Sequence, residues 1–235
     1  MVKTKLQTNF SQPVVVFDTE TGGLNHEPEI SWNLDPSIKR DKGCRIDGTI
    51  TAPAAPILEL ASVRLSPITL EEVDYFHTYI GPNKGQSLDE YLAKCHPIAL
   101  QVNGFGKGER RKKLQNAPTS KEALTAWIKW LKFGSNRYQP FLPCGQNVRF
   151  DINMVNAACI RSGLDFQIKT NHILELISYS LVYFSFPNTG SVANYKLTTV
   201  AECLGISTSK AHTALADVQM TAECLRRFMR EFTGA

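Results

Sequence analysis

The sequence predicts an α/β fold with a mixed β-sheet, and an α+β arrangement is the alternative. Three strand-like segments come first, and helical segments alternate with short strands after them. The 235 residues contain no internal repeat or low-complexity tract. A core of this size forms without disulfides or structural metals, so the length suits a single domain. We therefore expect one domain over residues 1–235, with an insertion at about 25–56.

The strands are expected mainly in the first third of the chain. Residues 13–18 form a run of β-branched and aromatic residues that ends in an acid, which is typical of a buried strand. Gly22 and Gly23 then break this pattern. Residues 57–65 alternate as a second strand and residues 75–80 form a third, so the three could make an antiparallel meander.

Between the first two strands, residues 25–56 are irregular and contain four prolines and a lone Trp32. We expect this stretch to be a long loop or insertion. Loops of this length are uncommon in compact domains and often carry function, and a surface excursion without a role is the alternative.

The rest of the chain is mainly helical by pattern. Apolar residues recur at helical spacing, Thr119 or Ser120 can cap one helix, and Gly163 and Gly205 end two others. Helices are expected at residues 88–102, 120–133, 148–162, 173–183, 197–204 and 213–232, with a short strand at 141–144.

Charge and cysteine content narrow the class of protein without deciding it. The net charge of +4 and the pI of about 8.7 are compatible with a polyanionic partner, but many metabolic enzymes share them. The six cysteines form no CxxC pair and no zinc spacing, which favours reduced, buried cysteines in a cytoplasmic protein. Neither a signal peptide nor a membrane span is predicted.

A cluster of basic residues occupies one short stretch, at Lys107, Arg110, Arg111, Lys112 and Lys113. Such a cluster could hold the phosphates of a nucleic acid, and a solvated surface is the other interpretation. Removing the charges would distinguish these two interpretations, because phosphate contacts make nucleic-acid binding depend on the salt concentration.

Carboxylates at the end of the first strand are the first candidates for chemistry. Asp18 and Glu20 are two residues apart, so both side chains point to one face of the strand. An acidic pair at the end of an apolar strand is costly unless a cation binds there, and oxygen ligands of this kind suit Mg²⁺. The alternative is a strand end whose acids reach water.

Two further acids lie near predicted helix starts. Asp151 follows a short apolar strand, where an acid also suits the helix dipole. His212 and Asp217 are five residues apart, which is roughly 140° of rotation at about 3.6 residues per turn. They therefore converge only if His212 precedes the helix and Asp217 lies in its early turns.

Taken together, these residues resemble the motifs of the DEDDh exonucleases, the DnaQ-like family. The patterns are Asp-x-Glu from Asp18, Asn-x-x-Phe-Asp up to Asp151 and His-x-Ala-x-x-Asp up to Asp217. The resemblance extends over nearly the whole chain apart from the insertion, including residues 15–24, 57–63 and 196–201. The departures are Gly22 where the family usually has threonine, the long stretch at 25–56, and Gln146 where a histidine or serine is common.

The resemblance implies an RNase H-like fold, which is a mixed five-stranded sheet flanked by helices, here with a long insertion after the first strand. It implies that four acids hold two Mg²⁺ ions, which Mn²⁺ can replace; these are Asp18, Glu20, Asp151 and Asp217. His212 would activate water as a general base, and the product would be a nucleoside 5′-monophosphate.

The resemblance also implies substrate contacts around the first two motifs. The backbone of Thr19 and Thr21 would approach the terminal nucleotide, and Leu24 would pack against its base. Phe150 either stacks on a base or, as we favour, fills the core, and Asn147 bonds the scissile region or its own turn.

The function that the resemblance implies is a 3′–5′ exonuclease, with the 3′ end of single-stranded DNA as the leading substrate. A 3′–5′ exoribonuclease in RNA trimming is the close alternative, because the motifs do not separate DNA from RNA. A polymerase proofreading subunit is disfavoured, since the last helix runs almost to Ala235 and leaves no room for a polymerase-binding tail. A non-catalytic nucleic-acid-binding module is disfavoured, since all four acids and the histidine are present. The possibility of a homodimer also stays open, because some members of the family form dimers.

Overall fold

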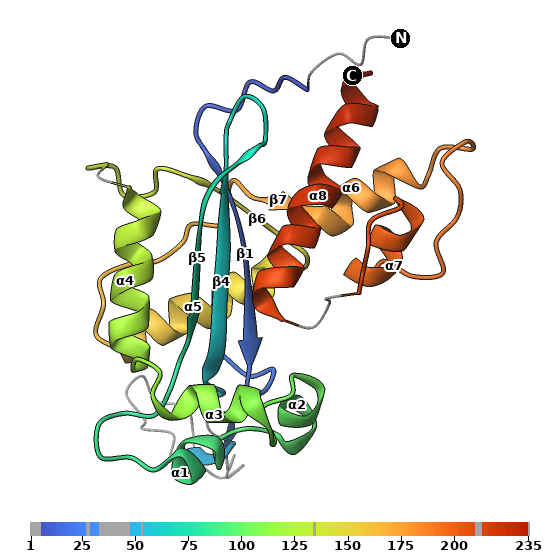
Figure 1. Ribbon diagram of the computed structural model, residues 1–235. Coiled ribbons are helices and arrows are strands. Elements are labelled where there is room, and N and C mark those ends of the chain that lie inside the picture. Colours follow the sequence, from blue (N-terminus) through green and yellow to red (C-terminus); the bar gives the residue numbers. More distant parts are fainter. Residues whose placement is uncertain are drawn as a thin grey trace, which may run out of the picture.

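The computed structural model describes residues 6–26, 29–32, 48–52, 54–133, 135–209 and 213–234. A five-stranded mixed sheet in the order β5-β4-β1-β6-β7 lies at its centre, with helices on both faces (Figure 1). The strands of this sheet are β1 (Val14–Thr21), β4 (Ile57–Leu65), β5 (Glu72–Tyr79), β6 (Leu142–Gly145) and β7 (Leu174–Glu175). This confirms the fold class that the sequence predicts.

The first three strands of the sheet form the expected antiparallel meander. β1 pairs antiparallel with β4, and β4 pairs antiparallel with β5. On its other edge β1 pairs parallel with β6, which pairs parallel with β7. The third strand begins at Glu72, earlier than its apolar pattern predicts, and the register sets Glu20 opposite Glu59.

Helices cover the two faces of the sheet, and β1 supplies apolar side chains to both. Val14 and Val16 pack against the side that carries α8, whereas Val15 and Phe17 pack against the opposite side. This alternation is the period of two that a β-strand imposes. The first side is covered by α6 (Leu176–Tyr183), α7 (Leu197–Cys203) and α8 (Ala214–Thr233), and the second by α4 (Ser120–Lys132) and α5 (Val148–Arg161).

The segment that the sequence predicts as one helix over 88–102 is instead two short helices, α1 (Leu88–Leu92) and α2 (Pro97–Val102). Pro97 has no backbone N–H, so it suits the first position of a new helix better than the interior of a long one. A further helix, α3 (Glu109–Gln115), follows without having been predicted. Helices α1 to α3 lie beneath the C-terminal end of β1 (Figure 1).

Two other segments also differ in detail from the prediction. The expected helix at 173–183 begins with the two residues of β7 before α6 starts at Leu176. Within the insertion, β2 (Glu29–Trp32) and β3 (Gly48–Ala52) pair as an antiparallel ribbon, and residues 33–47 lie outside the described residues.

The five cysteines in the described part of the chain are free, but they are not all buried. Cys144, Cys159 and Cys224 are buried, Cys95 is half-buried and Cys203 is exposed. The expectation of buried cysteines is therefore wrong for Cys203. Among the described helices, none combines the length and apolar character needed to cross a membrane.

Trp127 provides a test of the packing between α4 and the sheet. Its buried indole lies against Phe17 and donates a hydrogen bond to Ser62 Oγ at 2.8 Å. Ser62→Ala would leave the indole N–H in the core without this acceptor, so we expect the free energy of unfolding to fall by about 1–3 kcal/mol. Urea denaturation of S62A, Trp127→Phe and the double variant measures the coupling between the two side chains. Strictly additive losses of unfolding free energy would contradict the predicted hydrogen-bond contribution.

Candidate active site

Acidic side chains converge where β1 meets the start of α8. Asp18 and Glu20 come from β1, Asp217 comes from the first turn of α8, and one carboxylate oxygen of each lies within 4.8 Å of the others. Asp18 and Glu20 continue the alternation of Val14 and Val16, so they point to the face that α8 covers. Three of the four predicted acids are thus brought together.

The start of α8 explains how Asp217 reaches this cluster. The helix begins at Ala214, and the Thr213 side chain caps it by accepting a hydrogen bond from the Ala216 N–H at 3.2 Å. Asp217 therefore lies in the first turn, as its convergence with β1 requires. His212 lies outside the described residues.

The fourth acid, Asp151, is buried in the first turn of α5 and is fixed to β1 by Thr19. Its Oδ1 accepts hydrogen bonds from the Thr19 backbone N–H at 2.9 Å and from Thr19 Oγ1 at 2.6 Å. The pairing of β1 with β6 covers only Val14 to Val16. The edge of β1 beyond that pairing is therefore available to α5, and Thr19 points to the α5 face because it alternates with Asp18 and Glu20.

The electrostatics of these acids favour a bound cation. Burial raises the pKa of Asp18 well above its ordinary value, and the charges of Asp151, Glu20 and Asp217 raise it further. Burial also raises the pKa of Glu20 to about 7, against the opposing effect of Arg110. The pKa of Asp151 is raised to about 7 by burial, although its hydrogen bonds from Thr19 oppose the shift. Such a set of oxygen ligands fits a hard divalent ion, which would relieve their repulsion.

A pocket of about 640 Å³ opens beside the acids. Four of the residues predicted to contact substrate, Thr19, Thr21, Leu24 and Phe150, are among those that line it, and Leu24 is 83% exposed. Phe150 is half-buried against the core and also lines the pocket, so its position is compatible with either of its predicted roles. The sequence does not indicate that α2 and the residues flanking it also line this pocket; they contribute His96, Ile98, Ala99, Val102 and Asn103.

These wall residues carry only a weak signal in the sequence. Ile98 and Val102 are four residues apart and both are 64% exposed, so they form one apolar face of α2 that stays open to the pocket. Their spacing alone is typical of a helix that packs into a core. Their place in the lining of the same pocket as Leu24 depends on the break at Pro97, which makes α2 a separate helix.

Asn147 stands apart from this pocket wall. It adopts a left-handed conformation with φ of 57° at the start of α5, and its side chain makes no capping hydrogen bond within the described structure. Its backbone N–H donates to Glu175 Oε1 at 2.7 Å, and the Val148 N–H donates to Glu175 Oε2 at 2.9 Å. Glu175 therefore anchors the start of the helix that carries Asp151.

The glycine that departs from the family pattern has a local structural reason. A Cβ on Gly22 would lie 2.4 Å from Cys95 Sγ and 3.0 Å from Pro56 Cδ. The backbone here is also held on both sides, because the Gly22 N–H donates to Pro56 O at 2.8 Å and the His96 N–H donates to Gly22 O at 2.6 Å. The second bond ties the start of α2 to the end of β1.

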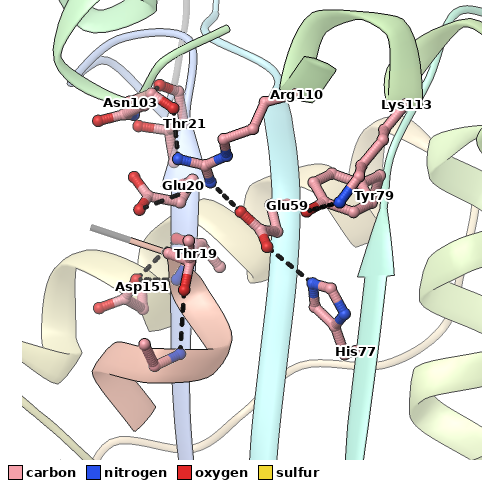
Figure 2. Close-up of polar contacts among 12 residues, drawn as sticks. Thr19, Glu20, Thr21, Glu59, His77, Tyr79, Asn103, Arg110, Lys113 and Asp151 are labelled. Atoms are coloured by element: carbon pink, nitrogen blue, oxygen red, sulfur yellow. Dashed lines mark hydrogen bonds and ion pairs between the residues drawn. The ribbon is translucent and has the colours of Figure 1, made fainter. Parts of the chain in front are cut away.

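The basic cluster at 107–113 does not form a uniformly open patch. Arg110 turns inward to the buried Glu59, where Figure 2 shows its guanidinium between β1 and β4. Arg111 pairs with Asp89, Lys112 pairs with Glu109, and Lys113 bonds the Tyr79 hydroxyl. Burial alone would raise the pKa of Glu59, but the hydrogen bond from His77 and the charge of Arg110 outweigh it and lower this pKa.

Sequence comparison connects this arrangement with known nucleases. The family model RNase_T, described as Exonuclease, matches residues 15–225. DNA polymerase III PolC-type from Pediococcus pentosaceus is 25% identical over 175 residues, which cover 74% of this chain and 10% of that protein. The chain therefore spans about a tenth of the length of this relative.

Solved structures share the fold at low sequence identity. The nuclease domain of 3′hExo, a DEDDh family member bound to rAMP, has a TM-score of 0.63 at 17% identity, covering 95% of this chain and 94% of that one. Exonuclease I from E. coli in complex with a dT13 oligonucleotide has a TM-score of 0.64 at 15% identity, covering 95% and 43%. Cell-death related nuclease 4 has a TM-score of 0.63 at 14% identity, covering 95% and 65%.

The raised pKa of Glu20 predicts how the metal-free protein responds to pH. Its ordinary pKa of 4.5 rises to about 7 on folding, so the folded state binds more protons between these values and loses stability as pH rises through them. Glu20→Gln removes this loss, so with EDTA at pH 8 we expect the variant to be more stable than wild type by on the order of 1–3 kcal/mol. Thermal melts from pH 5 to 8 measure this stability difference. If the stabilities of wild type and variant changed in parallel with pH, the prediction would be contradicted.

The tight contact at Gly22 predicts the result of restoring the residue usual in the family. Gly22→Thr would overpack the space against Cys95, so we expect the free energy of unfolding to fall by about 1–3 kcal/mol. Cys95→Ala removes the nearest atom and should recover part of this loss in the double variant. Thermal melts of the four proteins test it, and a Gly22→Thr chain as stable as wild type would show that Cys95 moves freely.

Proposed function

This chain belongs to the RNase_T exonuclease family, and we propose that it is a DEDDh enzyme that removes nucleotides one at a time from the 3′ end of single-stranded DNA. The observation that carries the proposal is the convergence of Asp18, Glu20 and Asp217 beside an apolar pocket. The pocket volume of about 640 Å³ lies within the range of small-ligand sites, which suits one terminal nucleotide.

We assign the four acids to metal binding, with Mg²⁺ as the ion and Mn²⁺ as its substitute. The residues are Asp18, Glu20, Asp151 and Asp217, and they offer only carboxylate oxygens, which these ions prefer. Two divalent ions held by these acids would supply positive charge to stabilise the attacking and leaving oxygens of an in-line displacement at phosphorus. Thr19 contributes by keeping the Asp151 carboxylate fixed to β1 through two hydrogen bonds.

Proton transfer is assigned to His212. A histidine titrates near neutral pH, so it suits the task of taking the proton from the attacking water. Attack of that water on the last phosphodiester forms a new P–O bond and breaks the bond to the 3′ oxygen of the preceding nucleotide. The products are a nucleoside 5′-monophosphate and a strand that is one nucleotide shorter.

The pocket walls are assigned to the terminal nucleotide. Leu24, Ile98 and Val102 in the pocket lining offer apolar surfaces to a base, and Phe150 offers a ring. These contacts use the face of a base rather than its edges, so activity should be tolerant of sequence. A base that enters this pocket must be unstacked, which favours a single-stranded end.

DNA is our leading substrate, and RNA is the second candidate. The similarity to a DNA polymerase III and to an Exonuclease I solved with a DNA oligonucleotide supports DNA. The similarity to 3′hExo solved with rAMP supports RNA. The choice depends on whether the pocket accepts a 2′-hydroxyl. A non-catalytic binding module is disfavoured because all four acids are retained, and a homodimer stays a prediction.

The proposal is tested with 5′-labelled single-stranded DNA and RNA of the same sequence, with Mg²⁺ or with EDTA. We expect a ladder that shortens from the 3′ end, release of nucleoside 5′-monophosphate, and faster turnover of DNA. Asp18→Ala removes a proposed metal ligand and should reduce turnover by more than the ~10–100-fold that is typical when an outer-shell partner is lost.

Glu72→Gln is the matched control, since this exposed acid lies on the edge strand β5, away from the acidic cluster. Its turnover should equal that of wild type. Faster shortening of RNA would move the assignment to an exoribonuclease. Folded protein that shortens neither strand with Mg²⁺ present would refute the nuclease proposal and favour the binding module.

A further inference from the structure

Two glutamates lie side by side on the adjacent strands β1 and β4, at the acidic cluster. The register of β1 with β4 sets Glu20 directly opposite Glu59, so both side chains lie on one face of the sheet. Glu59 is 0% exposed. Like charges in this position repel, and a buried carboxylate is costly without a partner. Something must therefore compensate this pair.

Arg110 from α3 provides that compensation. Its Nη2 donates to Glu59 Oε2 and lies 4.0 Å from Glu20 Oε1, so one guanidinium serves both acids (Figure 2). The side chain is only 18% exposed, and its guanidinium carbon lies 4.3 Å from the centre of the Phe105 ring. This stacking fixes the plane of the guanidinium.

The same guanidinium also holds the end of the pocket wall. Arg110 Nη1 donates to the Asn103 carbonyl at 2.5 Å, and Asn103 Nδ2 donates to the Thr21 carbonyl at 3.0 Å. Asn103 caps the C-terminal end of α2, which carries Ile98 and Val102. Arg110 therefore links the wall of the pocket to the strand that carries Glu20.

Glu59 is held from its other side as well. Its Oε1 accepts a hydrogen bond from His77 Nε2 at 2.7 Å, so each of its two oxygens has a partner (Figure 2). With Glu59 fixed in this way, Arg110 has a rigid anchor on β4. A lysine could not replace it, because an ammonium lacks the planar fork that reaches Glu59 and Asn103 together.

We propose that Arg110 is a positioning residue of the active site, which sets the Glu20 carboxylate for metal binding and joins the α2 wall of the nucleotide pocket to the metal cluster. This inference rests on the proposed function for its role in catalysis. Its effect on metal binding does not need the nuclease reaction to be observed.

The test must separate positioning of Glu20 from simple neutralisation of Glu59. Arg110→Gln alone leaves the buried Glu59 without its guanidinium partner, so it can fail to fold. The double variant Arg110→Gln/Glu59→Gln removes one positive and one negative charge, which keeps the net charge of the site unchanged. The amide oxygen that it places on β4 can still accept the hydrogen bond from His77. Any change in cation binding by this variant therefore reports on the placement of Glu20.

The measurement is Mn²⁺ binding to the purified full chain by calorimetry without nucleic acid, followed by turnover of 5′-labelled DNA. We expect the double variant to fold, to bind Mn²⁺ about 10–100-fold more weakly, and to lose turnover by a similar factor. KM for the oligonucleotide should rise as kcat falls, because the Asn103 carbonyl has lost its hydrogen bond from Arg110 Nη1 and only the Asn103 side-chain bond to Thr21 remains.

Arg111→Gln is the matched control, since its partner Asp89 has a side chain that is 88% exposed, and its Mn²⁺ affinity should equal that of wild type. Wild-type Mn²⁺ affinity and wild-type kcat in the folded double variant would overturn the inference and leave Arg110 as a structural counter-ion of Glu59. If wild type shortens no nucleic acid, the proposed function fails, and the Mn²⁺ titration still decides the role of Arg110.

Discussion

Along β1, successive side chains point to opposite faces of the sheet, and each part of the candidate active site depends on that alternation. The apolar residues Val14 to Phe17 fix the strand in the core from both sides. The next residues then continue the same two faces, so that Asp18 and Glu20 meet α8 while Thr19 meets Asp151 of α5. One strand thereby collects groups from two helices that lie on opposite sides of the sheet.

This arrangement carries an electrostatic cost that the fold must offset. Burial and mutual repulsion raise the pKa values of Asp18 and Glu20, so the acids resist ionisation together when no cation is present. The core beneath them is fully buried, and the free energy of that burial can offset the electrostatic cost at this one end. A divalent cation bound to these acids, as we propose, would offset this cost by relieving their repulsion.

The segment with α1 to α3 forms part of the pocket that we propose for the terminal nucleotide. The bond from the His96 N–H to the Gly22 carbonyl and the bond from Asn103 to the Thr21 carbonyl fix both ends of α2 to the end of β1. The apolar face of α2 then lines the same pocket as Leu24. Arg110 completes the connection because it contacts Asn103 and the buried Glu59 at once. The wall of the pocket and the acids are therefore parts of one bonded network.

The sequence by itself determined the elements whose pattern is local. The runs that form β1 and β4 and the periodic faces of α4, α5 and α8 were predicted nearly to their ends, because alternation and helical spacing depend on neighbouring residues. The motifs around Asp18, Asp151 and Asp217 identified the acids by resemblance. The break at Pro97, the helix α3 and the two-residue strand β7 were missed, since such short elements are set by what they pack against. Only the tertiary structure decided that Ile98 and Val102 face a pocket, and that Arg110 of the basic cluster turns inward to Glu59. These outcomes depend on contacts between residues far apart in the chain, such as Arg110 with Glu59 and Asn103 with Thr21, which no local pattern records.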